Sequence, residues 1–109
     1  MTGTEKQIAW ATEIKNANYN AINREIERIT NLMGYDAKSG ADVTGYKAEI
    51  AKYDSIKKLY DKMFSAADLQ SAGAIISKKD KIPSVKMIYD LASAKAAKCH
   101  ISFESALGL

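Results

Sequence analysis

Residues 4–34 read TEKQIAWATEIKNANYNAINREIERITNLMG, and this stretch decides the fold because it is the longest helical pattern in the chain. Thr4 and Gln7 have the spacing of a capping box, in which each side chain accepts a hydrogen bond from the other residue's backbone amide. Gly34 is expected to end the helix, since glycine readily adopts the left-handed conformation there. Apolar residues recur at steps of mostly three and four, which predicts one buried face made of Ile8, Ala11, Ile14, Ala21, Ile22, Ile26, Ile29, Leu32 and Met33.

Such a helix is too long for a compact domain of this size. It would extend roughly 45 Å, whereas the radius of gyration of the domain should be about 13 Å. The helix must therefore protrude, bend or break. Asn16, Asn18 and Asn20 compete for backbone hydrogen bonds, so we expect a kink or a short interruption there. Trp10, at the edge of the apolar face, is expected to be at least partly buried against the second or fourth helix.

Three further helices are expected along the rest of the chain. One follows a cap at Asp42 or Thr44, one starts at Ser65, and one carries Pro83 in its first turn and frays or breaks after His100. The stretch 92–97 is rich in small residues, which predicts that the last helix crosses the centre of the core. No segment has the period-two alternation of a strand. The sequence therefore predicts an all-α, compact bundle of about four helices (4–33, 43–64, 66–78 and 83–106) in a single domain, 1–109.

Composition and charge are those of a folded domain and indicate no particular class of partner. The chain of 109 residues is 47% hydrophobic, enough to bury a core without metals or disulfides. The net charge is only +3, and dedicated nucleic-acid binders usually concentrate more positive charge on one face. No apolar run approaches the ~18 residues of a membrane span, and the first residues lack the features of a signal peptide. We therefore expect a cytoplasmic protein with no membrane segment.

The sequence offers no catalytic or metal-binding constellation. Cys99 and His100 are the only residues of their types, and as neighbours on a helix they point about 100° apart. A zinc site needs several convergent ligands, and a catalytic pair needs facing geometry. The glycines match neither a phosphate-binding loop nor a dinucleotide fingerprint. We therefore expect no enzyme activity, no cofactor and no metal, and we expect Cys99 to be a small core residue.

The most basic cluster lies at the junction before the last helix. Lys78, Lys79 and Lys81, followed by Lys86, could contact phosphates at a corner of the fold. Lysine without arginine is poorly suited to reading bases, which relies on bidentate side chains. A junction that simply keeps the surface soluble is therefore the favoured interpretation of these four lysines.

Three tyrosines share one line on the expected helix 43–64. Tyr46, Tyr53 and Tyr60 are spaced by seven, and aromatic side chains are prominent in interaction hot spots. The three could form an exposed ridge that binds a partner. A core position with the hydroxyls at its rim is the somewhat favoured alternative.

The N-terminal residues Thr4, Lys6, Gln7, Trp10, Ala11 and Ile14 carry a family resemblance. They match a T-x-K-Q-x-x-W-A-x-x-I signature, which resembles that of small uncharacterised proteins of phages, other mobile elements and their bacterial hosts. The signature covers about a tenth of the chain. In that group a later W-I-D-N-R-like element tends to appear, and the nearest counterpart here, residues 75–79, lacks its Trp, acidic residue and Arg. The resemblance implies a mobile-element accessory protein, a class that includes small inhibitors of host defence.

Two classes of function remain in competition. The favoured one is a small, non-catalytic protein–protein interaction module that uses the long first helix and the tyrosine ridge as a docking surface. The alternative is a nucleic-acid-associated protein whose four lysines contact phosphates. The sequence identifies neither the partner nor the oligomeric state.

Overall fold

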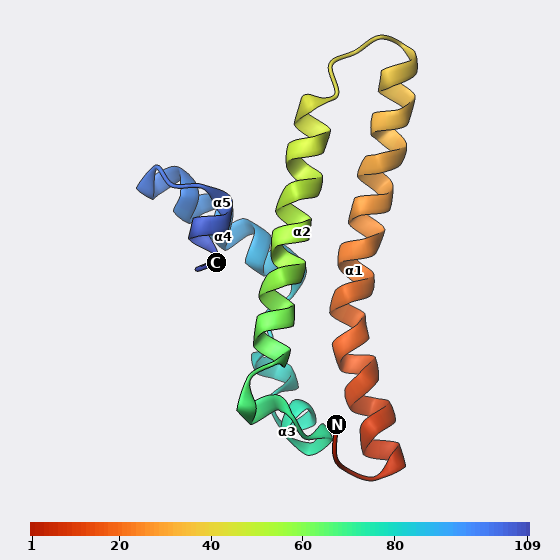
Figure 1. Cartoon of the computed structure of the whole chain (residues 1–109), viewed down its shortest axis with the longest axis vertical. Helices are drawn as coiled ribbons and strands as arrows, with labels where there is room; N and C mark the ends of the chain where they lie inside the picture. Colours follow the sequence, from red (N-terminus) through yellow and green to blue (C-terminus); the bar gives the residue numbers. More distant parts are fainter.

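The computed structural model describes residues 1–109 and contains five α-helices and no strand (Figure 1). The predicted all-α class is confirmed. The helices, with two short 3-10 turns between them, are α1 (Glu5–Lys38), α2 (Thr44–Phe64), η1 (Ala67–Leu69), α3 (Ala72–Ser77), η2 (Lys79–Lys81), α4 (Val85–Cys99) and α5 (Phe103–Ala106).

The helix α1 begins as its sequence predicts and ends later than expected. The Thr4 hydroxyl accepts from the Gln7 amide at 3.2 Å, and the Thr4 amide donates to the Gln7 side chain at 3.1 Å. Gly34 does not end the helix, which continues to Lys38. An uninterrupted ladder of hydrogen bonds outweighs the modest helix propensity of one glycine. The left-handed glycine that follows the helix is Gly40, with a φ of 80°.

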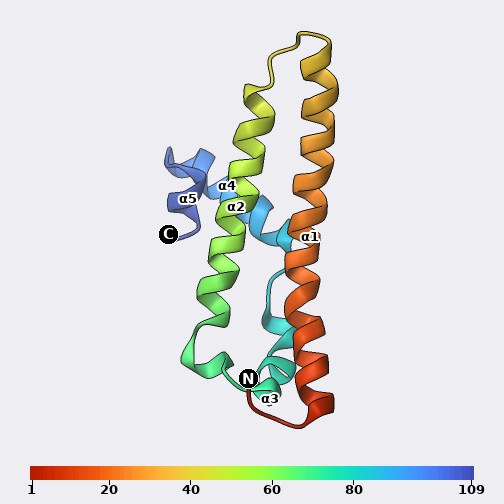
Figure 2. The ribbon, with the colours of Figure 1, turned by 45° about the vertical axis from the view of Figure 1, so that its right-hand side comes forward.

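The asparagines do not interrupt α1. The helix is continuous from end to end (Figures 1 and 2). The Asn18 side chain donates to the carbonyl oxygen of Ile14 at 3.4 Å, one turn back. That bond is made within the helix and leaves it continuous, so the expected interruption is wrong.

The core lies in one half of an antiparallel hairpin made by α1 and α2. The helix α3 closes the lower end in Figure 1, and α4 crosses the hairpin near its middle before running away from it. Tyr19 on α1 donates to Asp61 on α2 at 2.6 Å. The core combines residues of four helices and η1, namely Ala11, Ile22, Ile56, Tyr60, Phe64, Leu69, Ala72, Ile75, Val85 and Ile88.

The expected helix 66–78 is replaced by a turn and a shorter helix. Ser65 does not cap a new helix, because its hydroxyl donates to the carbonyl oxygen of Asp61 at 2.6 Å and so closes α2. The cap of α3 is Ser71, which accepts from the Ala74 amide at 3.1 Å. The Thr2 carbonyl accepts from the Ala72 amide at 2.8 Å, which ties the N-terminus to the start of α3.

The last expected helix, 83–106, is two helices separated at His100. Ser84 caps α4, and Pro83 stands just before that cap, outside the first turn. His100 has a φ of 53°, a left-handed conformation that ends α4. The small-residue stretch does not cross the core centre: within 92–97 only Ala92 is buried, because this part of α4 has already left the hairpin.

Two expectations about burial and compactness are also corrected. Cys99 is exposed on the outlying end of α4 and is not a core residue. Trp10 is 48% exposed, so it is partly buried, but it lies outside the core cluster. The molecule is elongated, 53 × 33 × 18 Å, with a radius of gyration of 16.4 Å. The compact bundle is wrong because the far half of the hairpin has no third helix against it. No helix combines the length and the apolar character needed to cross a membrane.

Candidate interaction surface

The four lysines of the basic cluster lie at η2 and in the first turn of α4. Three of them face carboxylates: Lys78 pairs with Asp68, Lys79 lies 3.5 Å from Asp80, and Lys86 lies 3.4 Å from Asp90. The fourth, Lys81, makes no ion pair. A phosphate at this corner of the fold would have to compete with these carboxylates for most of the positive charge.

The tyrosines of the expected ridge lie in three different environments. Tyr60 is completely buried, and its hydroxyl donates to the carbonyl oxygen of Pro83 at 2.6 Å. Tyr46 is half-buried and donates to Asp36 near the tip of the hairpin. Tyr53 lines a cleft between three helices, so the three do not form one exposed ridge.

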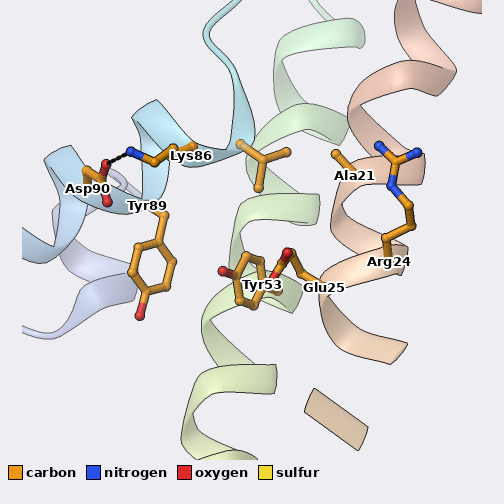
Figure 3. A pocket seen from close by; sticks show the side chains of 8 residues that line it. Ala21, Arg24, Glu25, Tyr53, Lys86, Tyr89 and Asp90 are labelled. Carbon is orange, nitrogen blue, oxygen red and sulfur yellow. Dashed lines mark hydrogen bonds and ion pairs between the residues drawn. The ribbon is translucent and has the colours of Figure 1, made fainter. Parts of the chain in front are cut away.

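Tyr53 lines a cleft of about 430 Å³ where α4 crosses the hairpin (Figure 3). Its ring stacks on Tyr89 of α4, with centroids 5.3 Å apart and planes 19° from parallel. The cleft is bounded by all three helices: α1 contributes Ala21, Arg24 and Glu25, α2 contributes Tyr53, and α4 contributes Val85, Lys86, Tyr89 and Asp90.

Hydrogen bonds hold Tyr89 in its place beside Tyr53. The Tyr89 hydroxyl donates to Glu49 at 2.5 Å, and the Lys52 ammonium, 3.0 Å from the same carboxylate, lies 5.5 Å from the Tyr89 ring centroid. The bond to Glu49, with burial, raises the pKa of Tyr89 to about 12. Burial alone would raise the pKa of Glu49, but the bonds from Tyr89 and Lys52 outweigh it and keep that pKa below its usual range. Tyr89 therefore stays protonated and Glu49 stays ionised around neutral pH, which preserves the hydrogen bond between them.

Two hydrogen-bond donors in the cleft have no partner within the protein. Glu25 pairs with Arg28 at 2.8 Å. Lys86 pairs with Asp90, the contact that the dashed line in Figure 3 marks. Arg24 makes no ion pair, and the Tyr53 hydroxyl makes no hydrogen bond. Burial, with the nearby Glu25 carboxylate, raises the pKa of Tyr53, so this hydroxyl stays protonated. The open groups of the cleft are thus donors, which suit an acceptor such as a carboxylate.

The outward face of α4 adjoins this cleft and carries two exposed apolar side chains. Met87 is 54% exposed and Leu91 is 65% exposed. Together with Ser84, Lys86 and Asp90 they line a shallow groove, which shares Lys86 and Asp90 with the cleft. Cleft and groove therefore form one continuous surface, which we term the α4 surface.

Cys99 and His100 lie away from the α4 surface. His100 is exposed at the end of α4, beside the exposed Cys99. No three His, Cys, Asp or Glu side chains converge in a way that could hold a metal ion.

Comparison of the chain with protein-family models, curated proteins and solved structures gives no match. The α4 surface is thus defined by its geometry alone. Sequence reasoning found Tyr53 but missed Arg24, Met87 and Leu91. Met87 and Leu91 are one helical turn apart and lie off the buried stripe that starts at Val85, a signal that was available in the sequence.

Proposed function

We propose that this protein is a non-catalytic protein–protein interaction module that binds its partner through the α4 surface. The observation that carries the proposal is the exposure of Met87 and Leu91 side by side on one helix face. Exposed apolar patches on monomers commonly mark interaction sites. Burying a side chain such as Leu91 contributes about 1.5–3 kcal/mol when it is removed fully from water.

We further propose that the module is an accessory protein of a phage or another mobile element, acting in the cytoplasm, with inhibition of a host defence as one such role. The support is the N-terminal signature around Trp10. Thr4 and Gln7 of that signature form the capping box of α1, so part of the match has a structural explanation. Trp10 has no such role in the core and is the residue on which this classification depends.

Nucleic-acid association through Lys78, Lys79, Lys81 and Lys86 is the competing function. The ion pairs of Lys78, Lys79 and Lys86 argue against it, because phosphate binding gains from cations whose counterions are released. Nucleic-acid association predicts an affinity for DNA or RNA that falls steeply as the salt concentration rises. An interface built on Met87 and Leu91 predicts a weak dependence on salt.

Site-specific photocrosslinking tests the proposed function. Leu91 is replaced by the photoreactive benzoylphenylalanine, and the protein is irradiated in lysate of the cells that encode it, with and without prior nuclease treatment. The matched control carries the same group at Lys57, which is exposed on α2. We expect one protein to be crosslinked from position 91 and not from position 57.

Two results would contradict the proposal. One is crosslinking from position 91 that does not exceed the control. The other is a crosslinked product that disappears after nuclease treatment, which would favour the nucleic-acid function.

A further inference from the structure

The residues that line the α4 surface carry two positive and two negative charges, and the excess positive charge of the protein lies beside them along the chain. Residues 81–99 contain four lysines and one aspartate, a net charge of +3, which equals the net charge of the whole chain. The remaining residues are balanced in charge. A partner is therefore attracted to this segment by its own negative charge.

The cations around the α4 surface have few internal partners. Lys81, Lys95 and Lys98 make no ion pair, and neither does Arg24 at the rim of the cleft; only Lys86 has a carboxylate, Asp90, at 3.4 Å. Arg24 is the residue best suited to a carboxylate, because its guanidinium can donate two parallel hydrogen bonds.

The exposed face of α4 has the spacing of a helix-binding surface. Met87, Leu91, Ala94 and Lys98 follow one another at steps of four, three and four, and all are exposed. The methyl side chain of Ala94 lets another helix come close. Such a face accepts an amphipathic helix whose apolar residues repeat at the same steps.

We propose that the α4 surface binds an acidic, amphipathic helix of a partner protein. Apolar side chains of that helix cover Met87 and Leu91, and its carboxylates reach Lys95 and Lys98 at one end and Arg24 in the cleft at the side. This inference rests on the proposed function and adds the chemistry of the partner.

The apolar face and the charge pattern favour this occupant over two others. A nucleic acid would cover Met87 and Leu91 with no apolar group to match them. A second copy of the chain would bring two segments of +3 charge together, which repel each other. A protein helix with apolar and acidic residues satisfies both features of the surface.

Selection from a randomised library of about 16-residue peptides, a length of about 24 Å as a helix, tests the inference with the full-length protein. We expect the selected peptides to carry a net negative charge and apolar residues at steps of three and four. The affinity of a selected peptide should fall about tenfold for Lys95→Glu/Lys98→Glu.

A matched charge reversal and a face variant serve as controls. Lys57→Glu/Lys58→Glu makes the same change of charge on the exposed side of α2 and should alter the affinity by less than about twofold. Leu91→Asp should abolish binding. All altered side chains are exposed, and circular dichroism melts establish that each variant remains folded.

The possible outcomes separate this inference from the proposed function. Neutral or basic peptides that still require Leu91 would overturn the acidic partner and leave the interaction module standing. Peptides that bind the Leu91→Asp variant as tightly as the wild type would overturn the inference. The proposed function would then be decided by the crosslinking experiment. If a DNA duplex displaces the peptide with a steep salt dependence, the occupant is a nucleic acid. If the protein forms a concentration-dependent dimer that Leu91→Asp abolishes, the occupant is a second copy of the chain. Either result would overturn the acidic helix.

Discussion

Tyr60 is the residue that links α2 to the start of α4. Its side chain is completely buried, and its hydroxyl donates to the Pro83 carbonyl at 2.6 Å. Tyr60→Phe keeps the ring and leaves that carbonyl without its partner, which should lower the free energy of unfolding by about 1–3 kcal/mol. Urea denaturation measures the change. Tyr35→Phe, at a side chain 75% exposed, is the control, and an equal effect of both substitutions would be inconsistent with the role of Tyr60.

The same buried hydroxyl makes stability depend on alkaline pH. Burial raises the pKa of Tyr60 from 10.0 to about 12. Above pH 10 the unfolded chain releases this proton while the folded protein still holds it, so deprotonation favours unfolding. The stabilisation from this group is complete below pH 10 and is lost between pH 10 and about 12. Denaturation midpoints across this range should fall more steeply for the wild type than for Tyr60→Phe, and parallel curves would refute the assignment.

At the scale of elements, local signals predict where helices start better than where they end. Thr4 and Gln7 are three residues apart and bond to each other without help from the fold. Gly34 and Gly40 both resemble helix stops, and the helix passes through the first because the continuing ladder of hydrogen bonds outweighs the low helix propensity of one glycine. Ser65 and Ser71 present the same ambiguity, since a serine can close one helix or cap the next.

Two glycine substitutions distinguish Gly34, inside α1, from Gly40, in the turn that follows it. An added Cβ at Gly34 meets no atom within 4 Å, and the residue is helical. Gly34→Ala should therefore stabilise the protein by about 0.5–1 kcal/mol. Gly40→Ala should destabilise it, because the φ of 80° is unfavourable for alanine. Thermal and urea unfolding measure whether each substitution raises or lowers the stability. A loss of stability with Gly34→Ala would mean that α1 ends there.

The candidate site could be predicted only in part, because it depends on how α4 crosses the hairpin. Arg24, Tyr53 and Tyr89 are far apart in the sequence and meet through that crossing. Helical periodicity assigns Tyr53 to an apolar stripe but does not say which helix covers it. The burial of Tyr60, seven residues later on the same line, shows that equal spacing can place side chains in unlike environments.

At the scale of the whole molecule, elongation is a measurable property. The radius of gyration is 16.4 Å, against about 13 Å for a compact domain of this length. X-ray scattering of the monomer, with its mass checked by light scattering, should give a value near the larger figure. A value near 13 Å would show that the hairpin folds back onto the core in solution.

The one-sided support of the hairpin has a further consequence for motion. Ile29 is the last buried residue of α1, and Ile56 is the first buried residue of α2, so the outer part of the hairpin is held mainly by its own two helices. Segments with few buried contacts open at low free-energy cost. Backbone amides should therefore exchange with deuterated solvent fastest near the tip and progressively more slowly toward Ile22, and uniform protection along α1 would contradict this. The tip of the hairpin should then open more often than the half that holds the core. A partner that docks on α4 contacts the more stable half.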